Sequence, residues 1–390
     1  MARGHLQAGN RMSRSIDVHR VERELRVPRI NRVRAAVLLI GALLALVAGA
    51  SPALAARSDA KAIWGPVSVD GRSLFPVYHG LGVGIFQISL NWASVAPTEP
   101  ENPTNPNDPA YRWPTEISYA IQHAARYHMK VLLQVEFTPL WANGGQQMNY
   151  PPTDVSSWAD FVTATARRYP AVHLWMIWGE PNRQPQFGSV VAADPGETQL
   201  TPDQSQAPQV YAQLLDAAYG VLKAANPSNL VIGGNTYTTG DISTEQWIEN
   251  MRLPNGRPPR MDLYGHNPFS WRPPDLSNPP SPDGEVDFSD LGRLEQLVQS
   301  NLAAPGQQIK LFLSEWSIPT APNDDEFDYY ETPGVQAQWI TDAWRLVRRS
   351  SFIYALGWVH LYDDPPGGSS GGLLYSDWFP KPGYYAFRNG

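Results

Sequence analysis

The stretch Trp175-Met176-Ile177-Trp178-Gly179-Glu180-Pro181-Asn182 ends an apolar run with a glutamate and then stops it with a proline. Consecutive apolar residues are typical of a strand that is buried on both faces, as in a parallel sheet. Proline does not continue such a strand, because it lacks the backbone N–H that the hydrogen-bond ladder needs. The pattern therefore predicts a buried parallel strand with Glu180 at its carboxyl end.

Short apolar runs alternate with amphipathic stretches along the rest of the chain. One such stretch carries Tyr211, Leu214, Leu215, Ala218 and Leu222, a spacing that predicts a helix. We expect eight strands, at Ala62–Gly65, Gly84–Leu90, Val131–Val135, Val172–Trp178, Leu230–Gly233, Met261–Gly265, Lys310–Ser314 and Tyr354–His360. Strands alternating with helices indicate an α/β fold, and eight such units fit a single-domain (β/α)8 TIM barrel.

A doubly wound parallel sheet is the alternative fold. Its usual first turn, G-x-G-x-x-G, is missing, and the nearest sequence, residues 80–84, precedes a strand instead of following one. Predicted strand-to-helix connections such as 91–114 and 181–208 are long, whereas helix-to-strand connections such as 127–129 are short. In a barrel the long connections all emerge at the carboxyl-terminal face, where active sites lie. The barrel is therefore the preferred prediction.

The first 56 residues have the organisation of a secretory signal. Arginines precede an apolar run of 16 residues at 35–50, and the small residues of Ala53-Leu54-Ala55-Ala56 follow it. A membrane-spanning helix needs about 20 apolar residues. We expect a signal peptide and n-region at 1–56, cleavage near Ala55 or Ala56, and secretion of 57–390 as the catalytic domain. An uncleaved signal that anchors the protein in the membrane is the alternative.

Composition excludes several classes of function. Without residues 1–56 the chain has 21 basic and 34 acidic residues, a formal net charge of −13, which argues against nucleic acid or an anionic membrane as partner. There is no cysteine, so disulfides and thiolate chemistry are excluded. No histidine pair has zinc-ligand spacing and no G-x-S-x-G elbow occurs, so we expect neither a metal nor an organic cofactor. The oligomeric state is left open.

Two glutamates end predicted strands on opposite sides of the barrel. Glu180 ends the fourth strand and Glu315 the seventh, and each has a tryptophan close to it in sequence. Strands four and seven face each other across the mouth, so both carboxyl groups are expected in one cleft. We expect about 5–5.5 Å between them, the separation found in retaining glycosidases. One carboxyl group would protonate the leaving oxygen, and the other would attack the anomeric carbon.

These motifs resemble those of the clan A glycoside hydrolases, in particular families 5 and 39. The pattern W-x-x-W-x-E-P-N matches at 175–182, and a strand-seven glutamate before an aromatic residue matches at Glu315-Trp316. T-P-x-W-A matches at 138–142, and H-x-P-aromatic matches at 266–269. The resemblance covers nearly all of 60–390. It implies a retaining hydrolase in which Glu180 is the general acid/base and Glu315 is the nucleophile.

Three positions depart from the pattern of these families. The asparagine that precedes the acid/base and holds the substrate 2-hydroxyl is replaced by Gly179. The arginine that keeps the nucleophile ionised is replaced by Gln87, and the strand-six tyrosine by Phe269. These departures indicate a different sugar, a neighbouring replacement or weakened catalysis. The candidate replacements for the lost amide are Asn91, Asn182 and Asn235.

Residues at strand ends and in the long connections are expected to bind substrate. Aromatic faces stack on sugar rings, and polar side chains bind sugar hydroxyl groups. The expected set is His266, Trp358, His360, Trp141, Trp316, Asn182, Asn91, Gln87 and Tyr237. For His266 the alternative is a buried structural histidine, and for the tryptophans of the loops it is packing.

The sequence as a whole predicts a secreted glycoside hydrolase. It would cleave O-glycosidic bonds of a poly- or oligosaccharide by a retaining double displacement, and so act in polysaccharide degradation. The alternative is a non-catalytic carbohydrate-binding protein on a degenerate barrel, which the departures at Gly179 and Gln87 favour.

Overall fold

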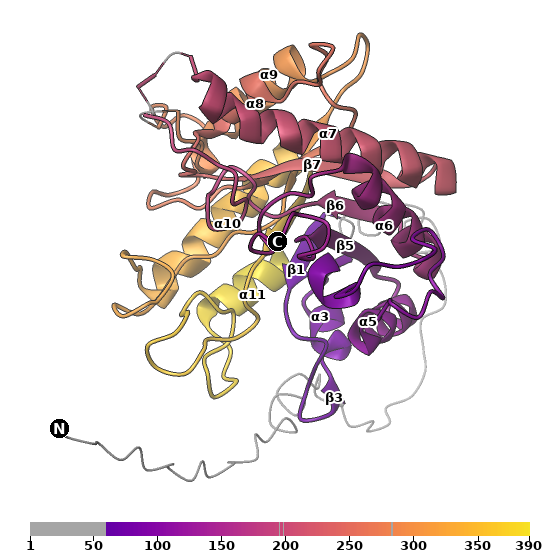
Figure 1. Ribbon diagram of the computed structural model, residues 1–390. Helices are drawn as coiled ribbons and strands as arrows, with labels where there is room; N and C mark the ends of the chain where they lie inside the picture. Colours follow the sequence, from indigo (N-terminus) through magenta and orange to yellow (C-terminus); the bar gives the residue numbers. More distant parts are fainter. Residues whose placement is uncertain (1–59, 195, 198, 282–283) are drawn as a thin grey trace, which may run out of the picture.

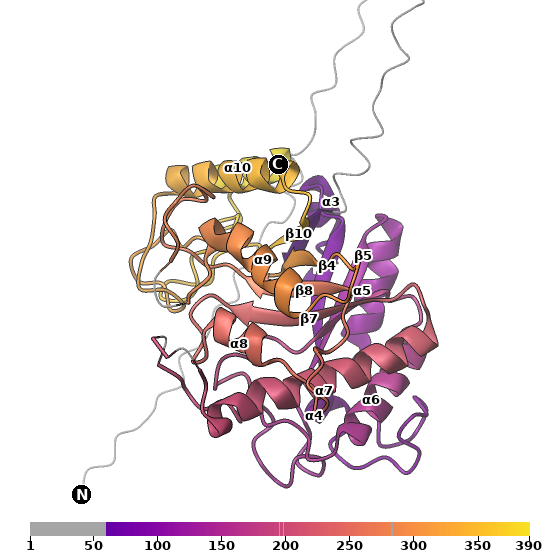
Figure 2. The same ribbon diagram turned by 90° about the horizontal axis from the view of Figure 1, so that it is seen from above.

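The computed structural model describes residues 60–194, 196–197, 199–281 and 284–390, so the predicted signal peptide lies outside the described residues. Eight parallel strands form a closed barrel, and helices surround it (Figures 1 and 2). In chain order the strands are β1 (Lys61–Trp64), β4 (Ile85–Asn91), β5 (Lys130–Glu136), β6 (Leu174–Ile177), β7 (Leu230–Tyr237), β8 (Leu263–Asn267), β9 (Lys310–Leu313) and β10 (Ile353–Trp358). The predicted (β/α)8 barrel is confirmed.

All eight predicted strands are present, and the largest difference in bounds is in β7. It continues to Tyr237, four residues past its predicted end, through a register shift between Gly234 and Thr236. The extension was not predicted because strands were identified from apolar runs, and Asn235 and Thr236 are polar.

Helices follow most of the barrel strands. They are α3 (Phe75–Gly80), α4 (Trp92–Val95), α5 (Thr115–Arg126), α6 (Val155–Arg168), α7 (Pro202–Ala225), α8 (Thr244–Asn250), α9 (Leu291–Asn301), α10 (Pro333–Arg349) and α11 (Pro382–Asn389). A short 3₁₀ helix, η1 (Phe288–Asp290), precedes α9, and a small hairpin joins β2 (Ser68–Val69) to β3 (Arg72–Ser73). None of the described helices is long and apolar enough to cross a membrane.

Polar side chains fix where the longer helices begin. The Thr201 hydroxyl accepts from the backbone N–H of Gln204, whose side chain accepts from the backbone N–H of Thr201. This capping box satisfies two N–H groups that the first turn of α7 leaves unpaired. Figure 2 shows α6 and α7 side by side, and the Trp158 indole of α6 donates to the Leu214 carbonyl of α7 at 3.0 Å.

The barrel interior is filled by apolar side chains. The buried members of this cluster are Ala62, Ile85, Leu132, Leu174, Met176, Ile232, Leu263, Phe312 and Ala355. A larger apolar cluster lies between the strands and the surrounding helices, and it includes the helical tryptophans Trp92, Trp158, Trp247, Trp339 and Trp344. The barrel interior is thus a packed apolar core, and the polar side chains that a functional site needs are expected at the carboxyl-terminal mouth.

The first strand and the last helix lie together (Figure 1). The Lys61 ammonium, on β1, donates to the carbonyl oxygens of Phe387 and Arg388 on α11, at 2.8 Å each. Burial, with a smaller contribution from Arg348, lowers the pKa of Lys61 to about 8. β1 also pairs with both β4 and β10, and this pairing closes the barrel.

Candidate active site

The backbone is strained where several strands leave the barrel. Five of the non-glycine residues with left-handed backbone angles lie there: Phe137 (φ 64°), Trp178 (66°), Glu180 (45°), Asn235 (48°) and His360 (69°). Four of them follow a strand within three residues, and Asn235 lies at the register shift of β7. Each such residue costs roughly 1–3 kcal/mol relative to an ordinary conformation. Strain of this kind is typical of functional sites, and here it gathers at the carboxyl-terminal mouth.

Glu180 is held in the sheet by its backbone although β6 ends at Ile177. The Trp178 N–H donates to the Val135 carbonyl of β5, and the Glu180 N–H donates to the Asn235 carbonyl of β7. These two hydrogen bonds hold the backbone of Glu180 between β5 and β7, and so they fix the position of its side chain at the mouth of the barrel. Glu180 is 8% exposed, which leaves its carboxyl group accessible at one side.

Two donors bind the Glu180 carboxylate. Arg183 Nη1 lies 2.6 Å from Oε2, and Asn267 Nδ2 lies 2.9 Å from Oε1. The Arg183 guanidinium also stacks over the Tyr237 ring, 4.3 Å from its centre. Both carboxylate oxygens of Glu180 thus accept hydrogen bonds in the substrate-free protein.

Glu315 lies directly across Asn267 from Glu180. Its backbone N–H donates to Asn267 Oδ1 at 3.1 Å, while Nδ2 of the same amide binds Glu180. Burial raises the pKa of Glu315 well above its ordinary value, and the carboxylates of Glu180, Glu136 and Glu326 raise it further, although Arg183 opposes them. The two glutamates are therefore close enough to influence each other, and Asn267 connects them.

The space beside Gly179 is filled by two side chains of β5. A Cβ atom at Gly179 would lie 2.7 Å from Gln134 Nε2 and 3.1 Å from Glu136 Oε2. Gln134 Nε2 donates to Glu136 at 2.9 Å, and Asn235 Nδ2 donates to Gln134 Oε1 at 3.3 Å. Burial raises the pKa of Glu136 to about 7, and Glu180 adds to this while the Gln134 hydrogen bond opposes it. A third carboxyl group therefore stands beside the pair.

Two of the predicted substrate-binding amides are engaged by the protein. Gln87 donates to the Ser314 carbonyl at 2.9 Å and accepts from the Ser314 hydroxyl at 3.0 Å, directly before Glu315. Asn182 donates to the carbonyls of Tyr237 and Ile242 and accepts from the Tyr237 N–H. Both side chains are buried. Gln87 holds the backbone that follows β9, and Asn182 holds the end of β7.

His266 is fully buried, as its structural alternative expected. Its Nε2–H donates to the Val286 carbonyl at 2.8 Å, so Nδ1 accepts from the Thr236 hydroxyl at 2.9 Å. Burial lowers the pKa of His266 to about 4, which keeps the ring neutral. His266 thus ties the end of β8 to the loop that precedes η1.

The predicted tryptophans differ in exposure. Trp316 and Trp358 are buried and pack edge to face, with ring centres 5.5 Å apart. Trp141 is partly exposed and donates to the Ala96 carbonyl at 2.8 Å. Asn91 caps α4 by accepting from Ser94 at 3.0 Å and is also partly exposed. Trp141 and Asn91 therefore keep surface that a ligand can reach.

His360 meets a carboxylate of the loop that follows β9. Its Nε2 lies 3.0 Å from the Glu326 carboxylate. Burial alone would lower the pKa of His360, but the hydrogen bond and charge of Glu326 outweigh burial and raise the pKa above its ordinary value. Because Glu326 also acts on Glu315, this pair belongs to the electrostatics of the mouth.

A pocket of ≈ 290 Å³ opens next to Tyr237. Its aromatic lining is Tyr237, Phe269, Trp271, Phe327 and Tyr329, and its carboxylates are Glu326 and Asp328. Trp271 is 50% exposed. Since Arg183 stacks on Tyr237 and binds Glu180, the pocket adjoins the Glu180 side of the site.

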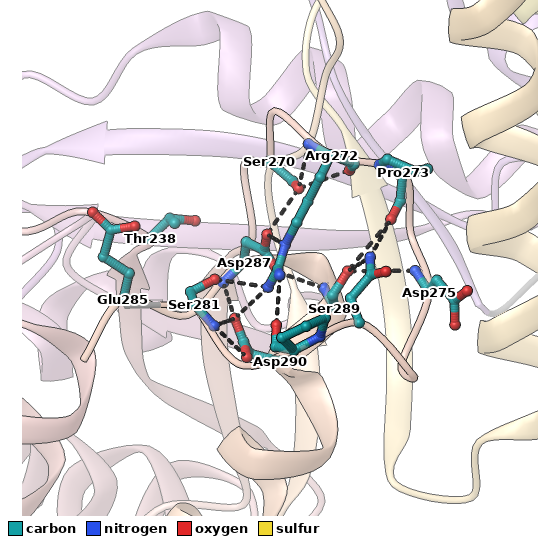
Figure 3. A network of polar contacts seen from close by, with 12 residues as sticks. Thr238, Ser270, Arg272, Pro273, Asp275, Ser281, Glu285, Asp287, Ser289 and Asp290 are labelled. Atoms are coloured by element: carbon teal, nitrogen blue, oxygen red, sulfur yellow. Dashed lines mark hydrogen bonds and ion pairs between the residues drawn. The ribbon is translucent and has the colours of Figure 1, made fainter. Parts of the chain in front are cut away.

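An ion-pair network holds the loop that supplies Ser270 and Trp271 to this pocket (Figure 3). The Arg272 guanidinium donates to Asp287 at 2.5 Å and to Asp290 at 3.2 Å, and the Ser270 hydroxyl donates to Asp287 at 3.0 Å. Asp287 is fully buried, so its charge depends on these partners. The network fixes the pocket wall to η1.

The described residues contain no group of three or more His, Asp or Glu side chains placed to hold a metal ion.

No protein-family model matches the chain, and no curated protein matches it in sequence. Solved structures do. A family 39 glycoside hydrolase from Bacteroides cellulosilyticus has a TM-score of 0.61 at 19% identity, over 86% of this chain and 64% of the other. A monomeric β-xylosidase from Caulobacter crescentus has a TM-score of 0.57 at 18% identity, over 85% and 67%. A glucosidase from Croceicoccus marinus has a TM-score of 0.59 at 14% identity, over 85% and 65%.

This chain thus spans about two thirds of the length of the proteins it resembles. At these identities the likeness establishes the fold. Asn267 and Arg183 were not among the predicted site residues, although each stands within three residues of one in the sequence. The signal for Asn267 was its place at the end of β8, directly after His266. The resemblance to clan A glycoside hydrolases predicted from the motifs is confirmed at the level of the fold: the chain has the parallel (β/α)8 barrel of the family 39 enzymes.

Proposed function

We propose that the protein is a glycoside hydrolase that cleaves O-glycosidic bonds of a poly- or oligosaccharide by a retaining double displacement. The observation that carries the proposal is the Asn267 amide, which binds the Glu180 carboxylate on one side and the Glu315 backbone on the other. The amide thus links the two residues that supply a pair of carboxyl groups, and such a pair is what glycoside hydrolysis requires.

In this mechanism Glu180 donates a proton to the glycosidic oxygen while Glu315 attacks the anomeric carbon. The glycosidic bond breaks, and a covalent glycosyl–enzyme forms at Glu315. Glu180, now ionised, takes a proton from water, and the resulting hydroxide releases the sugar and restores Glu315. Asn267 keeps both groups in place through the two steps.

The aromatic pocket supports a saccharide as ligand. Rings such as Tyr237 and Trp271 offer apolar faces on which a sugar ring stacks, while Glu326 and Asp328 accept hydrogen bonds from hydroxyl groups. Because the pocket adjoins Glu180, which protonates the leaving oxygen, we assign it to the leaving-group side. Because the structural neighbours include a β-xylosidase and a glucosidase, β-xylosides and glucosides are the first substrates to test. The predicted signal peptide supports export of the enzyme.

A non-catalytic carbohydrate-binding protein is the second candidate. The observation that favours it is the raised pKa of Glu315, because a protonated carboxyl group is a poor nucleophile. The Arg183 guanidinium also lies 2.6 Å from the carboxylate that would have to supply the proton.

The deciding experiment uses purified 57–390 on aryl glycosides and on plant and bacterial polysaccharides, with sugar release as the readout. Glu180→Gln and Glu315→Gln should each lower kcat/KM by about 100-fold or more, a rise of roughly 2.7 kcal/mol in the barrier. Glu249→Gln, at an exposed glutamate of α8, is the matched control and should leave kcat/KM unchanged.

Different failures separate the candidates. A protein that binds a glycan in calorimetry but releases no sugar supports the binding protein. Full activity in both glutamine variants would contradict the assigned pair, and neither binding nor release across the panel would contradict both candidates.

A further inference from the structure

Arg183 lies between the Glu180 carboxylate and the aromatic pocket. Its backbone is fixed by a turn, because its N–H donates to the Glu180 carbonyl at 3.1 Å and its own carbonyl accepts from Phe187 at 2.8 Å. Its side chain is less confined, with 35% of its surface exposed against 10% for the side chain of Glu180. The guanidinium is therefore more open to solvent than the carboxylate that it binds.

The contacts of Glu180 suit its charged form. Oε2 accepts from Arg183, and Oε1 accepts from Asn267, so both oxygens face donors and one of these donors is a cation. Glu315 has the opposite surroundings, since carboxylates face it from three elements and no described side chain is seen to donate to its carboxyl group. The charged and titratable groups around Glu180 and Arg183 are Glu136, Tyr237, Asp241, Glu315 and Glu326.

This distribution is the reverse of what double displacement needs at its start. Glu180 must carry the proton as the acid, and Glu315 must be ionised as the nucleophile. In the substrate-free structure the guanidinium stabilises charge on Glu180, and the neighbouring carboxylates favour a proton on Glu315. The Arg183–Glu180 ion pair therefore has to open before Glu180 can act as an acid.

We propose that Arg183 is a positioning residue that holds Glu180 in its charged form in the substrate-free protein and separates from Glu180 when a glycan binds. The inference rests on the proposed function, since only a general acid needs this release. The step it permits is a proton transfer through solvent: an O–H bond breaks at Glu315, one forms at Glu180, and the pair keeps a charge of −1. Once Glu180 is neutral, its attraction for Arg183 is lost, and the Tyr237 ring retains the guanidinium by a cation–π contact.

The first test compares pH profiles of the parent, Arg183→Met and Arg183→Lys. The profile of kcat/KM reports the free enzyme, and that of kcat reports the substrate complex. In R183M the alkaline limb of kcat/KM should move up by about 1 pH unit or more, the scale of a lost opposite charge. The alkaline limb of kcat should stay where it is, because the pair is already separated in the complex. R183K keeps the charge and should follow the parent.

Two results would overturn the inference. Equal shifts of both limbs in R183M would mean that Arg183 stays on Glu180 in the complex. No shift in either limb would mean that Arg183 does not control the charge of Glu180. A merely structural role would lower the melting temperature of R183M and leave both limbs in place.

A second test does not need turnover. In a ¹³C titration of the glutamate carboxyl signals, with Glu180 assigned by its loss in E180Q, Glu180 should titrate at lower pH in the parent than in R183M. A crystal of the parent with bound glycan should show Arg183 beyond hydrogen-bonding distance of Glu180. If the parent releases no sugar, the proposed function fails on its own, and equal titrations in parent and R183M would then overturn the inference about Arg183.

Discussion

The interior and the mouth of the barrel are built from the same eight strands by opposite rules. The interior is apolar and closely packed, with Phe312 and Leu132 among its fully buried members. The mouth buries polar groups instead, with Glu136 and Asn267 almost or fully enclosed and Glu180 in a left-handed conformation. Stability is concentrated in the first region, while the second holds charge and strain that a reaction can use.

The largest expected effect is in the interior. Phe312→Ala removes a fully buried ring from the cluster and should lower the free energy of unfolding by about 3–5 kcal/mol, as measured by denaturant titration. The folded fraction should keep the parent's kcat/KM, because Phe312 lies below the mouth. A loss under about 1 kcal/mol would contradict the contrast between the two regions.

At the mouth, a substitution should stabilise the protein. Glu136→Gln removes a carboxyl group whose pKa rises from the ordinary 4.5 to about 7 on folding. The folded parent holds this proton to higher pH than the unfolded chain, so its stability falls as pH rises from about 4.5 to about 7, and E136Q escapes that loss. The variant should be up to about 3 kcal/mol more stable at pH 8 and equal at pH 4.

Denaturant titrations at several pH values measure the Glu136 effect. Glu249→Gln, at an exposed position, serves as the control and should differ from the parent by the same small amount at every pH. An E136Q difference that does not change between pH 4 and pH 8 would mean that Glu136 is not held in a raised-pKa environment.

The smallest effect on stability is expected at the rim of the pocket. Trp271→Ala truncates a side chain that is half exposed, so the free energy of unfolding should change by no more than about 0.5 kcal/mol. If the ring stacks on the leaving group, KM should rise about 3–10-fold, the scale of one aromatic contact, while kcat stays near the parent value. Tyr330→Ala is the control, since Tyr330 is 53% exposed and is not part of the pocket lining.

The fold could be predicted because its signals are local. Apolar runs and helical spacing lie within single segments, and they gave all eight strands. The position of Glu180 and Glu315 near strand ends could be predicted from the same signals. Their hydrogen-bond partners could not be predicted, because these depend on the register between strands and on the conformation of the loops.

Two cases show this limit. The loss of asparagine at Gly179 was visible in the sequence, but the filling of that space by Gln134 and Glu136 follows from the pairing of β5 with β6. His266 was expected either as a ligand or as a buried residue, and only the position of Val286 decides that both of its ring nitrogens have partners.

The closure of the barrel through β1 has a consequence for how the chain folds. β1 pairs with β10, nearly 300 residues later in the sequence (Lys61 with Leu356), and Lys61 reaches the carbonyls of α11. At about 5–20 residues per second, ribosomal synthesis leaves β1 without these partners for on the order of 15–60 s. During that time the β1 edge that pairs with β10 stays unpaired, and β9 adds a second unpaired edge only for the roughly 40 residues of synthesis that separate it from β10. Unpaired strand edges are templates for aggregation. A fragment that stops before residue 353 would keep those edges permanently, so a shortened version of this protein should be an aggregating chain and not a smaller barrel.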